Sequence, residues 1–128
     1  MKEQITSSII MVRPKNFGFN AETAINNSFQ KKNDILDDSQ IAAKAIAEFD
    51  AMVEKIRSKG IEVIVWEDSI KPKKPDAIFP NNWFTTHVDN SIVTFPMYSE
   101  ARRYERREDL IDSLSNKGTK RYSFEYYE

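Results

Sequence analysis

A long amphipathic segment between two short apolar runs constrains the fold more than any other feature of the sequence. Residues 39–59 place apolar side chains at three- and four-residue spacing, which predicts a helix with one buried face. These side chains belong to Ile41, Ala45, Phe49, Met52, Val53 and Ile56. The runs at residues 8–12 and 62–67 are continuous, as is typical of strands covered on both faces. This order predicts two parallel strands of one sheet, joined by a right-handed helical crossover.

The second half of the chain predicts a hairpin. Strands are expected at residues 83–88 and 91–95. Asp89 and Asn90 between them tolerate left-handed backbone conformations, so we expect a two-residue turn. The register of this turn pairs Phe84 with Phe95, Thr86 with Val93, and Val88 with Ser91 on the better core face. The only histidine, His87, then lies on the other face, where we expect a structural or exposed role.

The remaining segments complete a repeated pattern. Residues 101–116 predict a helix and residues 119–124 a strand, so the second half has the order strand, strand, helix, strand. The first half has the order strand, helix, strand and looks like a similar unit that lacks one strand. Residues 16–38 have weak periodicity and predict a surface loop, a lid or a short helix capped by Asn20.

Composition limits the chain to one α/β domain and excludes several chemistries. At 128 residues with 40% hydrophobic content, the chain is long enough for one domain, and we do not expect two. The absence of cysteine excludes disulfides, thiolate metal ligands and a cysteine nucleophile. One histidine cannot build a multi-histidine zinc site, and three scattered glycines cannot form a phosphate-binding loop. We therefore expect no cofactor and no metal.

Charge and hydropathy give expectations about partners and location. The 19 basic and 20 acidic residues nearly cancel, so no global field attracts nucleic acid or an anionic membrane. Neither end of the chain nor any internal segment has the apolar run of a signal peptide or a membrane span. These observations predict a cytoplasmic protein that binds neither nucleic acid nor membrane.

Two arginine pairs form the most conspicuous charged cluster. On one continuous helix, Arg102 would face Arg106 and Arg103 would face Arg107, like-charge pairs that each cost about 0.2–0.5 kcal/mol. Such a helix would gain from an external anion or from a neighbouring element. Because a guanidinium donates two parallel hydrogen bonds, a carboxylate is a suitable partner. The alternative is a solvated charged surface without a specific ligand.

A second candidate group has the pattern D-x-x-F-x-x-N and consists of Asp76, Phe79 and Asn82. A carboxylate, an aromatic ring and an amide on one short loop can receive a planar, nitrogen-rich group. Asp76 would accept from N–H groups, Phe79 would stack on the plane, and Asn82 would both donate and accept. The alternative is that these residues are ordinary turn formers before a strand.

Four segments together resemble one known superfamily. The segments MVRPKNFGFN, AINNSFQ, PDAIFPNNWFTTH and TFPMYSEARRYERR are similar, in order and spacing, to the N-terminal part of the amidinotransferase and arginine deiminase superfamily, the penteins. The resemblance is nearest to the arginine-deiminase-related citrulline-utilisation hydrolases. It implies a five-bladed α/β propeller of ββαβ units, of which this chain would hold about two. Residues 1–75 would be an incomplete first blade and residues 76–128 a second blade.

The resemblance also implies a chemistry. Penteins act on arginine-like substrates at a guanidinium or ureido carbon, with a cysteine nucleophile, a histidine acid/base and acidic residues that hold the terminal nitrogens. Relatives have similar residues at the positions of Asp76, Phe79 and Asn82, which are therefore expected to bind substrate. An arginine after the hairpin binds the substrate carboxylate in relatives. Here Arg102 or Arg103 is the candidate, with Arg103 slightly preferred.

Two departures from the superfamily pattern shape the functional hypothesis. Asn82 replaces a common carboxylate, and because an amide can donate to a ureido oxygen, a citrulline-like substrate is expected. The chain has no cysteine to match the nucleophile of the superfamily. Its one histidine, His87, belongs to the hairpin and does not match the catalytic histidine. We therefore expect a fragment that contributes substrate binding to a hydrolase or amidinotransferase but is inactive alone. The alternative is a non-catalytic binding or interaction domain. Unpaired strand edges would favour self-association in either case.

Overall fold

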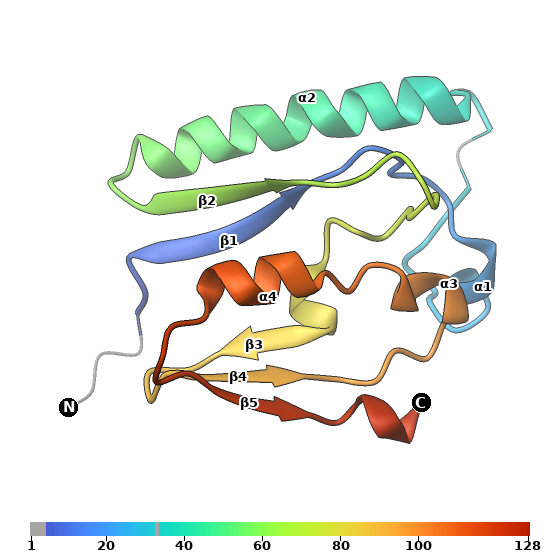
Figure 1. Ribbon diagram of the computed structural model, residues 1–128. Helices are drawn as coiled ribbons and strands as arrows, with labels where there is room; N and C mark the ends of the chain where they lie inside the picture. Colours follow the sequence, from blue (N-terminus) through green and yellow to red (C-terminus); the bar gives the residue numbers. More distant parts are fainter. Residues whose placement is uncertain (1–4, 33) are drawn as a thin grey trace.

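The computed structural model describes residues 5–32 and 34–128 and shows the predicted parallel crossover (Figure 1). Strands β1 (Ser8–Arg13) and β2 (Glu62–Glu67) pair in parallel, from Ser8 opposite Glu62 to Arg13 opposite Glu67. Helix α2 (Asp38–Arg57) connects them. The order and direction predicted for this half are confirmed.

Local signals define both ends of α2. The Asp37 carboxylate accepts a hydrogen bond from the Gln40 N–H at 2.8 Å, and the Gln40 side chain accepts one from the Asp37 N–H at 3.0 Å. This capping box satisfies backbone donors that have no partner within the helix. Beyond the helix, Gly60 has φ +82°, a conformation that is costly for residues with a Cβ. Phe49 is buried as predicted, whereas Met52 is 43% exposed, so it is not the core residue that its spacing indicated.

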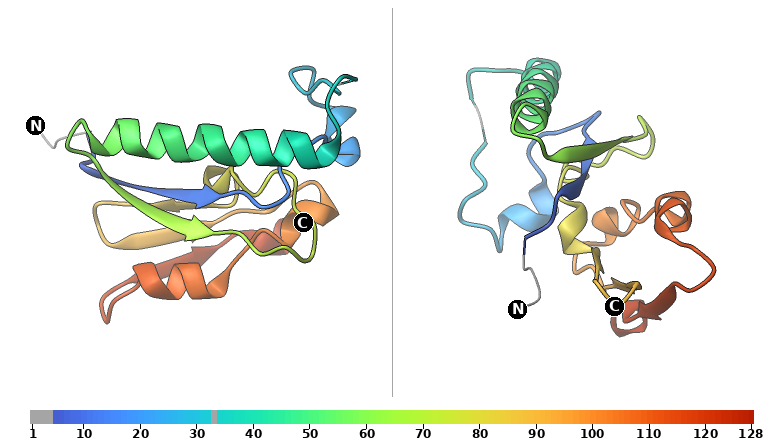
Figure 2. Two further views of the ribbon diagram at one scale, coloured as in Figure 1. Left: turned by 90° about the horizontal axis from the view of Figure 1, so that it is seen from above. Right: turned by 90° about the vertical axis from the view of Figure 1, so that its left-hand side faces the viewer.

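The β1–β2 sheet is covered on both faces, which explains its continuous apolar sequence. On one face, Phe49 and Val53 of α2 pack with Val63 and with partly buried residues of both strands. The other face belongs to a larger core that α4 (Glu108–Leu114) and the second sheet complete. Figure 2 shows α2 on the outer side of this arrangement. The members of the larger core are Val12, Ala77, Trp83, Phe84, Ile92, Met97, Leu110 and Ile111.

The second sheet has the predicted strand, strand, helix, strand order. Strand β4 (Ser91–Thr94) lies in the middle, antiparallel to β3 (Phe84–Thr86) and parallel to β5 (Lys120–Ser123). This mixed α/β arrangement is consistent with part of a pentein fold, and the number of blades stays a prediction. Every residue of β5, at one edge of this sheet, is exposed. Self-association through unpaired strand edges stays a prediction.

The hairpin register differs from the predicted one by one residue. Phe84 pairs with Thr94 and Thr86 with Ile92, and the His87 N–H donates to Ser91 O at 2.9 Å. The loop therefore has three residues, 88–90, and Asn90 at its end adopts φ 62°. Three-residue loops with a left-handed last position are a common alternative to the two-residue turn. This register places Ile92 on the buried face with Phe84, and His87 is exposed as expected.

The helix predicted over residues 101–116 is broken into α3 (Glu100–Arg103) and α4. Between them Glu105 is buried, and Arg107 has an extended backbone with φ −129° and ψ 105°. The like-charge pairs predicted on a continuous helix face are therefore wrong. A continuous helix would have carried those repulsions, whereas in the broken helix every one of the four arginines pairs with an acid: Arg102 with Glu105, Arg103 and Arg106 with Glu128, and Arg107 with Asp109.

The remaining helical elements in the described residues are the short helix α1 (Ala21–Ala24) and two 3₁₀ helices, η1 (Pro80–Asn82) and η2 (Glu125–Tyr127). Asn20 caps α1, as predicted for a short helix in this segment. Within residues 5–32 and 34–128, no helix has both the length and the apolar character needed to cross a membrane.

Candidate functional site

Asp76 lies at the centre of a buried polar cluster built from three distant parts of the chain. Its side chain is 12% exposed. The Asn20 side-chain amide donates to Asp76 Oδ2 at 2.7 Å. Arg102 Nε lies 3.7 Å from the same oxygen, and Arg102 Nη2 donates to the Asp76 main-chain oxygen at 3.4 Å. Among the described residues, the other Asp76 carboxylate oxygen has no hydrogen-bond partner, so it can accept from a ligand.

Glu105 fixes the guanidinium of Arg102. Arg102 Nε and Nη2 each lie 2.9 Å from a different oxygen of the Glu105 carboxylate, a bidentate pair. The two residues are three apart in the sequence, the i,i+3 spacing at which side chains meet across one helical turn. Burial raises the pKa of Glu105 despite the lowering effect of Arg102. Arg102 Nη1 makes no hydrogen bond to any described residue, so one edge of this guanidinium remains available.

A hollow of about 430 Å³ opens beside Asp76. Phenylalanine side chains from two regions line it, and among the described residues Asp76 is its one acidic lining residue and Lys31 its one basic lining residue. These phenylalanines are Phe17, Phe19, Phe29 and Phe79. Aromatic faces attract cations and also contact alkyl groups favourably, so this lining suits a cation with apolar substituents. Two of the predicted site residues, Asp76 and Phe79, therefore share one cavity.

Asn82 lies apart from that lining. It is exposed at the end of η1, where its backbone N–H donates to Phe79 O at 3.1 Å. Its side chain makes no hydrogen bond to the described residues and does not line the phenylalanine hollow. His87 instead lines a separate groove of about 780 Å³ along β1 and β3. Within the part of the chain that the structure describes, no group of three or more His, Asp and Glu side chains could hold a metal ion.

Arg103 and Arg106 turn away from Asp76 toward the last residue of the chain. Arg103 Nε lies 2.5 Å from one oxygen of the Glu128 carboxylate and donates to Met97 O at 3.2 Å. Arg106 forms an ion pair with the other oxygen of Glu128. Of the two partners expected for the arginine cluster, an external anion or a neighbouring element, Arg103 and Arg106 have the second, in the form of Glu128. Arg102 is the arginine that lies beside Asp76.

This double contact predicts a specific dependence of stability on pH. The hydrogen bond from Arg106 lowers the pKa of Glu128 below its usual value. Because the folded-state pKa is depressed, the pair stabilises the fold above the unfolded-state pKa of about 4.3, and this contribution is lost as pH falls. We expect Glu128→Gln to flatten the decrease in the free energy of unfolding between about pH 5 and pH 3, measured by urea unfolding. Glu48→Gln, at an exposed position of α2, is the control and should leave the slope unchanged.

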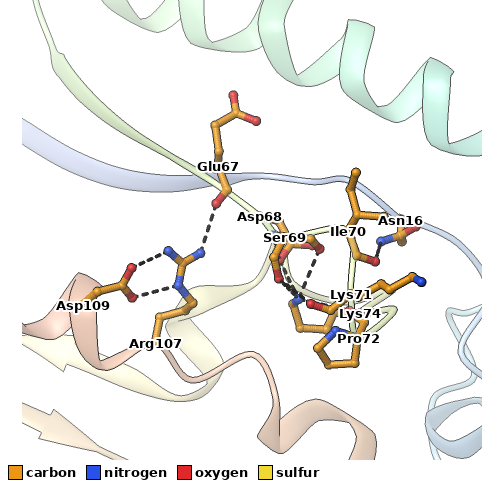
Figure 3. A network of polar contacts seen from close by, with 10 residues as sticks. All are labelled: Asn16, Glu67, Asp68, Ser69, Ile70, Lys71, Pro72, Lys74, Arg107 and Asp109. Atoms are coloured by element: carbon orange, nitrogen blue, oxygen red, sulfur yellow. Dashed lines mark hydrogen bonds and ion pairs between the residues drawn. The ribbon is translucent and has the colours of Figure 1, made fainter.

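The loop between β2 and Asp76 is organised around a buried ammonium group (Figure 3). Lys74 Nζ lies 3.0 Å from Asp68 Oδ1 and donates to Ser69 Oγ at 2.7 Å and to Pro72 O at 3.1 Å. The side chains of Lys74 and Asp68 are only 2% and 3% exposed. Since Asp76 follows two residues after Lys74, this loop fixes the chain that carries the site carboxylate.

Sequence reasoning assigned Asn20 only a capping role, and the structure adds its contact with Asp76. Asn20 is 5% exposed, which is unusual for an asparagine in a segment with so little periodicity. Next to it, Glu22 accepts a hydrogen bond of 2.5 Å from the Ser99 hydroxyl. No local pattern could reveal either contact, because their partners are 56 and 77 residues away.

Comparison with known proteins gives one match. A family model described as N,N dimethylarginine dimethylhydrolase, eukaryotic, matches residues 13–128. The matched range contains Asn20, Asp76, Phe79, Asn82 and Arg102. Searches of curated proteins and of solved structures returned no match.

Proposed function

Since the chain belongs to the N,N dimethylarginine dimethylhydrolase family, we propose that it binds a free amino acid whose side chain ends in a methylated guanidinium. The family lies within the pentein superfamily, in agreement with the resemblance found in the sequence. The narrower resemblance to citrulline-utilisation hydrolases stays a prediction. In this proposal the chain supplies substrate binding to the hydrolysis of a guanidinium C–N bond.

The observation that carries the proposal is the side-by-side placement of Asp76 and Arg102. An α-amino acid presents an ammonium and a carboxylate on one carbon, and a buried carboxylate beside a guanidinium is complementary to both. The distance of 3.7 Å between Arg102 Nε and Asp76 Oδ2 leaves no room for the three methylene groups of an arginine side chain. We therefore assign Asp76 and Arg102 to the same end of the ligand, rather than to opposite ends as the sequence led us to expect.

The phenylalanine hollow supports a methylated guanidinium at the other end. A dimethylated guanidinium is planar, cationic and partly apolar, which matches aromatic faces better than a fully hydrated cation does. Phe79 lies next to Asp76 in this lining and can stack on the side chain of the ligand. In this arrangement Asp76 binds the α-ammonium group of the ligand. The attraction for the guanidinium group then comes from the phenylalanine rings.

The overall reaction gives Asn82 a role on the product side. Water adds to the guanidinium carbon, the bond to the dimethylated nitrogen breaks, and this nitrogen takes a proton and leaves as dimethylamine. The carbon keeps the oxygen and becomes a ureido group. Donation from Asn82 to that oxygen is the citrulline-like recognition expected from the sequence. Since Asn82 lies outside the phenylalanine hollow, this role requires the ureido end of the ligand to reach beyond the hollow to η1. Because the chain has no cysteine, the proposal assigns binding, and no nucleophile, to these residues.

Titration calorimetry with four amino acids tests this proposal. We expect N,N-dimethyl-L-arginine to bind most tightly, followed by L-citrulline and L-arginine, whereas L-leucine should not bind. Asn82→Asp should weaken citrulline relative to arginine by about 10-fold, because a carboxylate cannot donate to the ureido oxygen. Failure of the wild-type chain to bind dimethylarginine would contradict the proposed function. An unchanged preference in Asn82→Asp would remove only the role of Asn82.

The alternative expected from the sequence is a non-catalytic binding domain. It predicts the same calorimetric ranking and, because the chain has no cysteine, the same lack of dimethylamine release from this chain alone, so release by the product of the complete gene, read beyond Glu128, must separate the two. The verified 128-residue chain should release none from dimethylarginine if it supplies binding alone. Measurable release would show that these residues also break the bond.

A further inference from the structure

We propose that Asn20 and Glu22 are positioning residues that set the geometry of the Asp76–Arg102 pair from a separate segment of the chain. This inference rests on the proposed function for its ligand, but its structural part can be tested without one. Figure 1 shows α1, which follows Asn20, beside α3, which carries Arg102. Hydrogen bonds join this segment to Asp76 and to the N-terminal end of α3.

Asn20 controls which oxygen of Asp76 remains available. Its side-chain oxygen accepts from the Glu22 N–H at 3.1 Å, which fixes the amide as the cap of α1. Its side-chain nitrogen consequently points to Asp76 Oδ2, at 2.7 Å. With Oδ2 occupied, the carboxylate is held in one rotamer and presents Oδ1 to a ligand. Capping and positioning thus use opposite ends of one side chain.

Glu22 fixes the helix that carries Arg102. Ser99 precedes α3, and its hydroxyl donates to Glu22 Oε2 at 2.5 Å rather than capping its own helix. The Ala101 N–H also points to this oxygen, at 3.4 Å. Ser99 is 5% exposed, whereas Glu22 is an exposed residue, so the contact is buried on the serine side. Because Asn20 and Glu22 are only two residues apart, a movement of this segment shifts Asp76 and α3 together.

An isosteric substitution separates the two roles of Asn20. Asn20→Asp keeps an oxygen that can cap α1, and aspartate is as good an N-cap as asparagine. It loses the donor to Asp76 and places a second carboxylate against Oδ2. We expect Asn20→Asp to remain folded, with a thermal midpoint lowered by repulsion between the two buried carboxylates, while dimethylarginine binds about 10- to 100-fold more weakly in calorimetry. A purely structural role predicts unchanged affinity in this folded variant.

Asn116→Asp is the matched control. Asn116 accepts from the Gly118 N–H at 2.9 Å in an exposed turn before β5 and does not line the phenylalanine hollow. The substitution makes the same change in charge and side-chain chemistry away from Asp76, so affinity should remain at the wild-type value. Equal affinities for wild type, Asn20→Asp and Asn116→Asp would overturn the proposal.

A ligand-free measurement distinguishes failure of this inference from failure of the proposed function. Three-bond couplings of Asp76, measured by NMR, should show one χ1 rotamer in wild type and Asn116→Asp, and averaging over rotamers in Asn20→Asp. An Asp76 side chain that stays fixed in Asn20→Asp would overturn the positioning role, whether or not the wild-type chain binds dimethylarginine. Glu22→Gln should speed hydrogen exchange of the Ala101 amide at the start of α3, because a neutral amide oxygen accepts more weakly from Ser99 and Ala101 than a carboxylate does.

Discussion

Replacement of Lys74 by methionine is expected to reduce the free energy of unfolding by about 3–5 kcal/mol. Methionine keeps most of the apolar length of lysine but removes the ammonium that pairs with Asp68 and donates to Ser69 and Pro72. The Asp68 carboxylate would then be buried without a countercharge, and its Oδ2 atom already lacks a hydrogen-bond partner. Urea unfolding followed by tryptophan fluorescence measures the effect, because Trp83 is 2% exposed in the adjacent core.

Two further variants test the cause of this loss. Lys73→Met removes a neighbouring lysine whose side chain is 61% exposed, and we expect a change of at most about 1 kcal/mol. Asp68→Asn combined with Lys74→Met removes both charges and should recover much of the stability lost in Lys74→Met. A Lys74→Met protein as stable as Lys73→Met would show that the buried pair does not hold this loop.

Asp76→Asn is expected to weaken binding of dimethylarginine by about 30-fold or more. The substitution removes the charge opposite the ligand cation and leaves the side chain the same size. If Asp76 binds the α-ammonium, then Nα-acetyl-dimethylarginine should bind weakly to wild type and with little further loss to Asp76→Asn. If Asp76 binds the guanidinium, the acetylated and free ligands should lose affinity equally. Calorimetry with both ligands therefore determines the orientation as well as the contribution.

Asp50→Asn serves as the control for a lost carboxylate. Asp50 pairs with Arg13 at 2.7 Å on the surface and lies outside the phenylalanine hollow, so affinity should not change. Agmatine, which lacks the α-carboxylate, gives a parallel test of Arg102. Arg102→Gln should weaken L-arginine but leave agmatine nearly unchanged. Wild-type affinity for dimethylarginine in Asp76→Asn would contradict the central place of this carboxylate in the site.

The crossover from β1 through α2 to β2 was predictable because its signals are local. The capping box at Asp37, the apolar spacing of α2 and the glycine at residue 60 all act within a few residues. The hairpin register was not predictable to one residue, since Asn90 can adopt a left-handed conformation in either a two- or a three-residue loop. Packing of Ile92 against the core, on the same face as Phe84, distinguishes the two.

The break between α3 and α4 has a similar explanation. Residues 101–116 have helical spacing, and the sequence showed only that a continuous helix would gain little from its charges. Glu105 is buried against Arg102, close to Asp76, at the point where the chain leaves the helix. That contact depends on where the Asp76 loop lies, so no window of neighbouring residues contains the information.

The sequence by itself determined the α/β class, the parallel crossover, the strand, strand, helix, strand order and the region in which a ligand site was expected. These follow from periodicity, capping and turn chemistry, which operate over a few residues, and from motif order. Only the tertiary structure decided that Arg102 meets Asp76, that Arg103 and Arg106 contact Glu128, and that Asn20 joins the site. Each of these is a contact between charged or polar side chains far apart in the chain. Its partner is selected by burial and distance, which exist only after the two sheets and their helices have packed together.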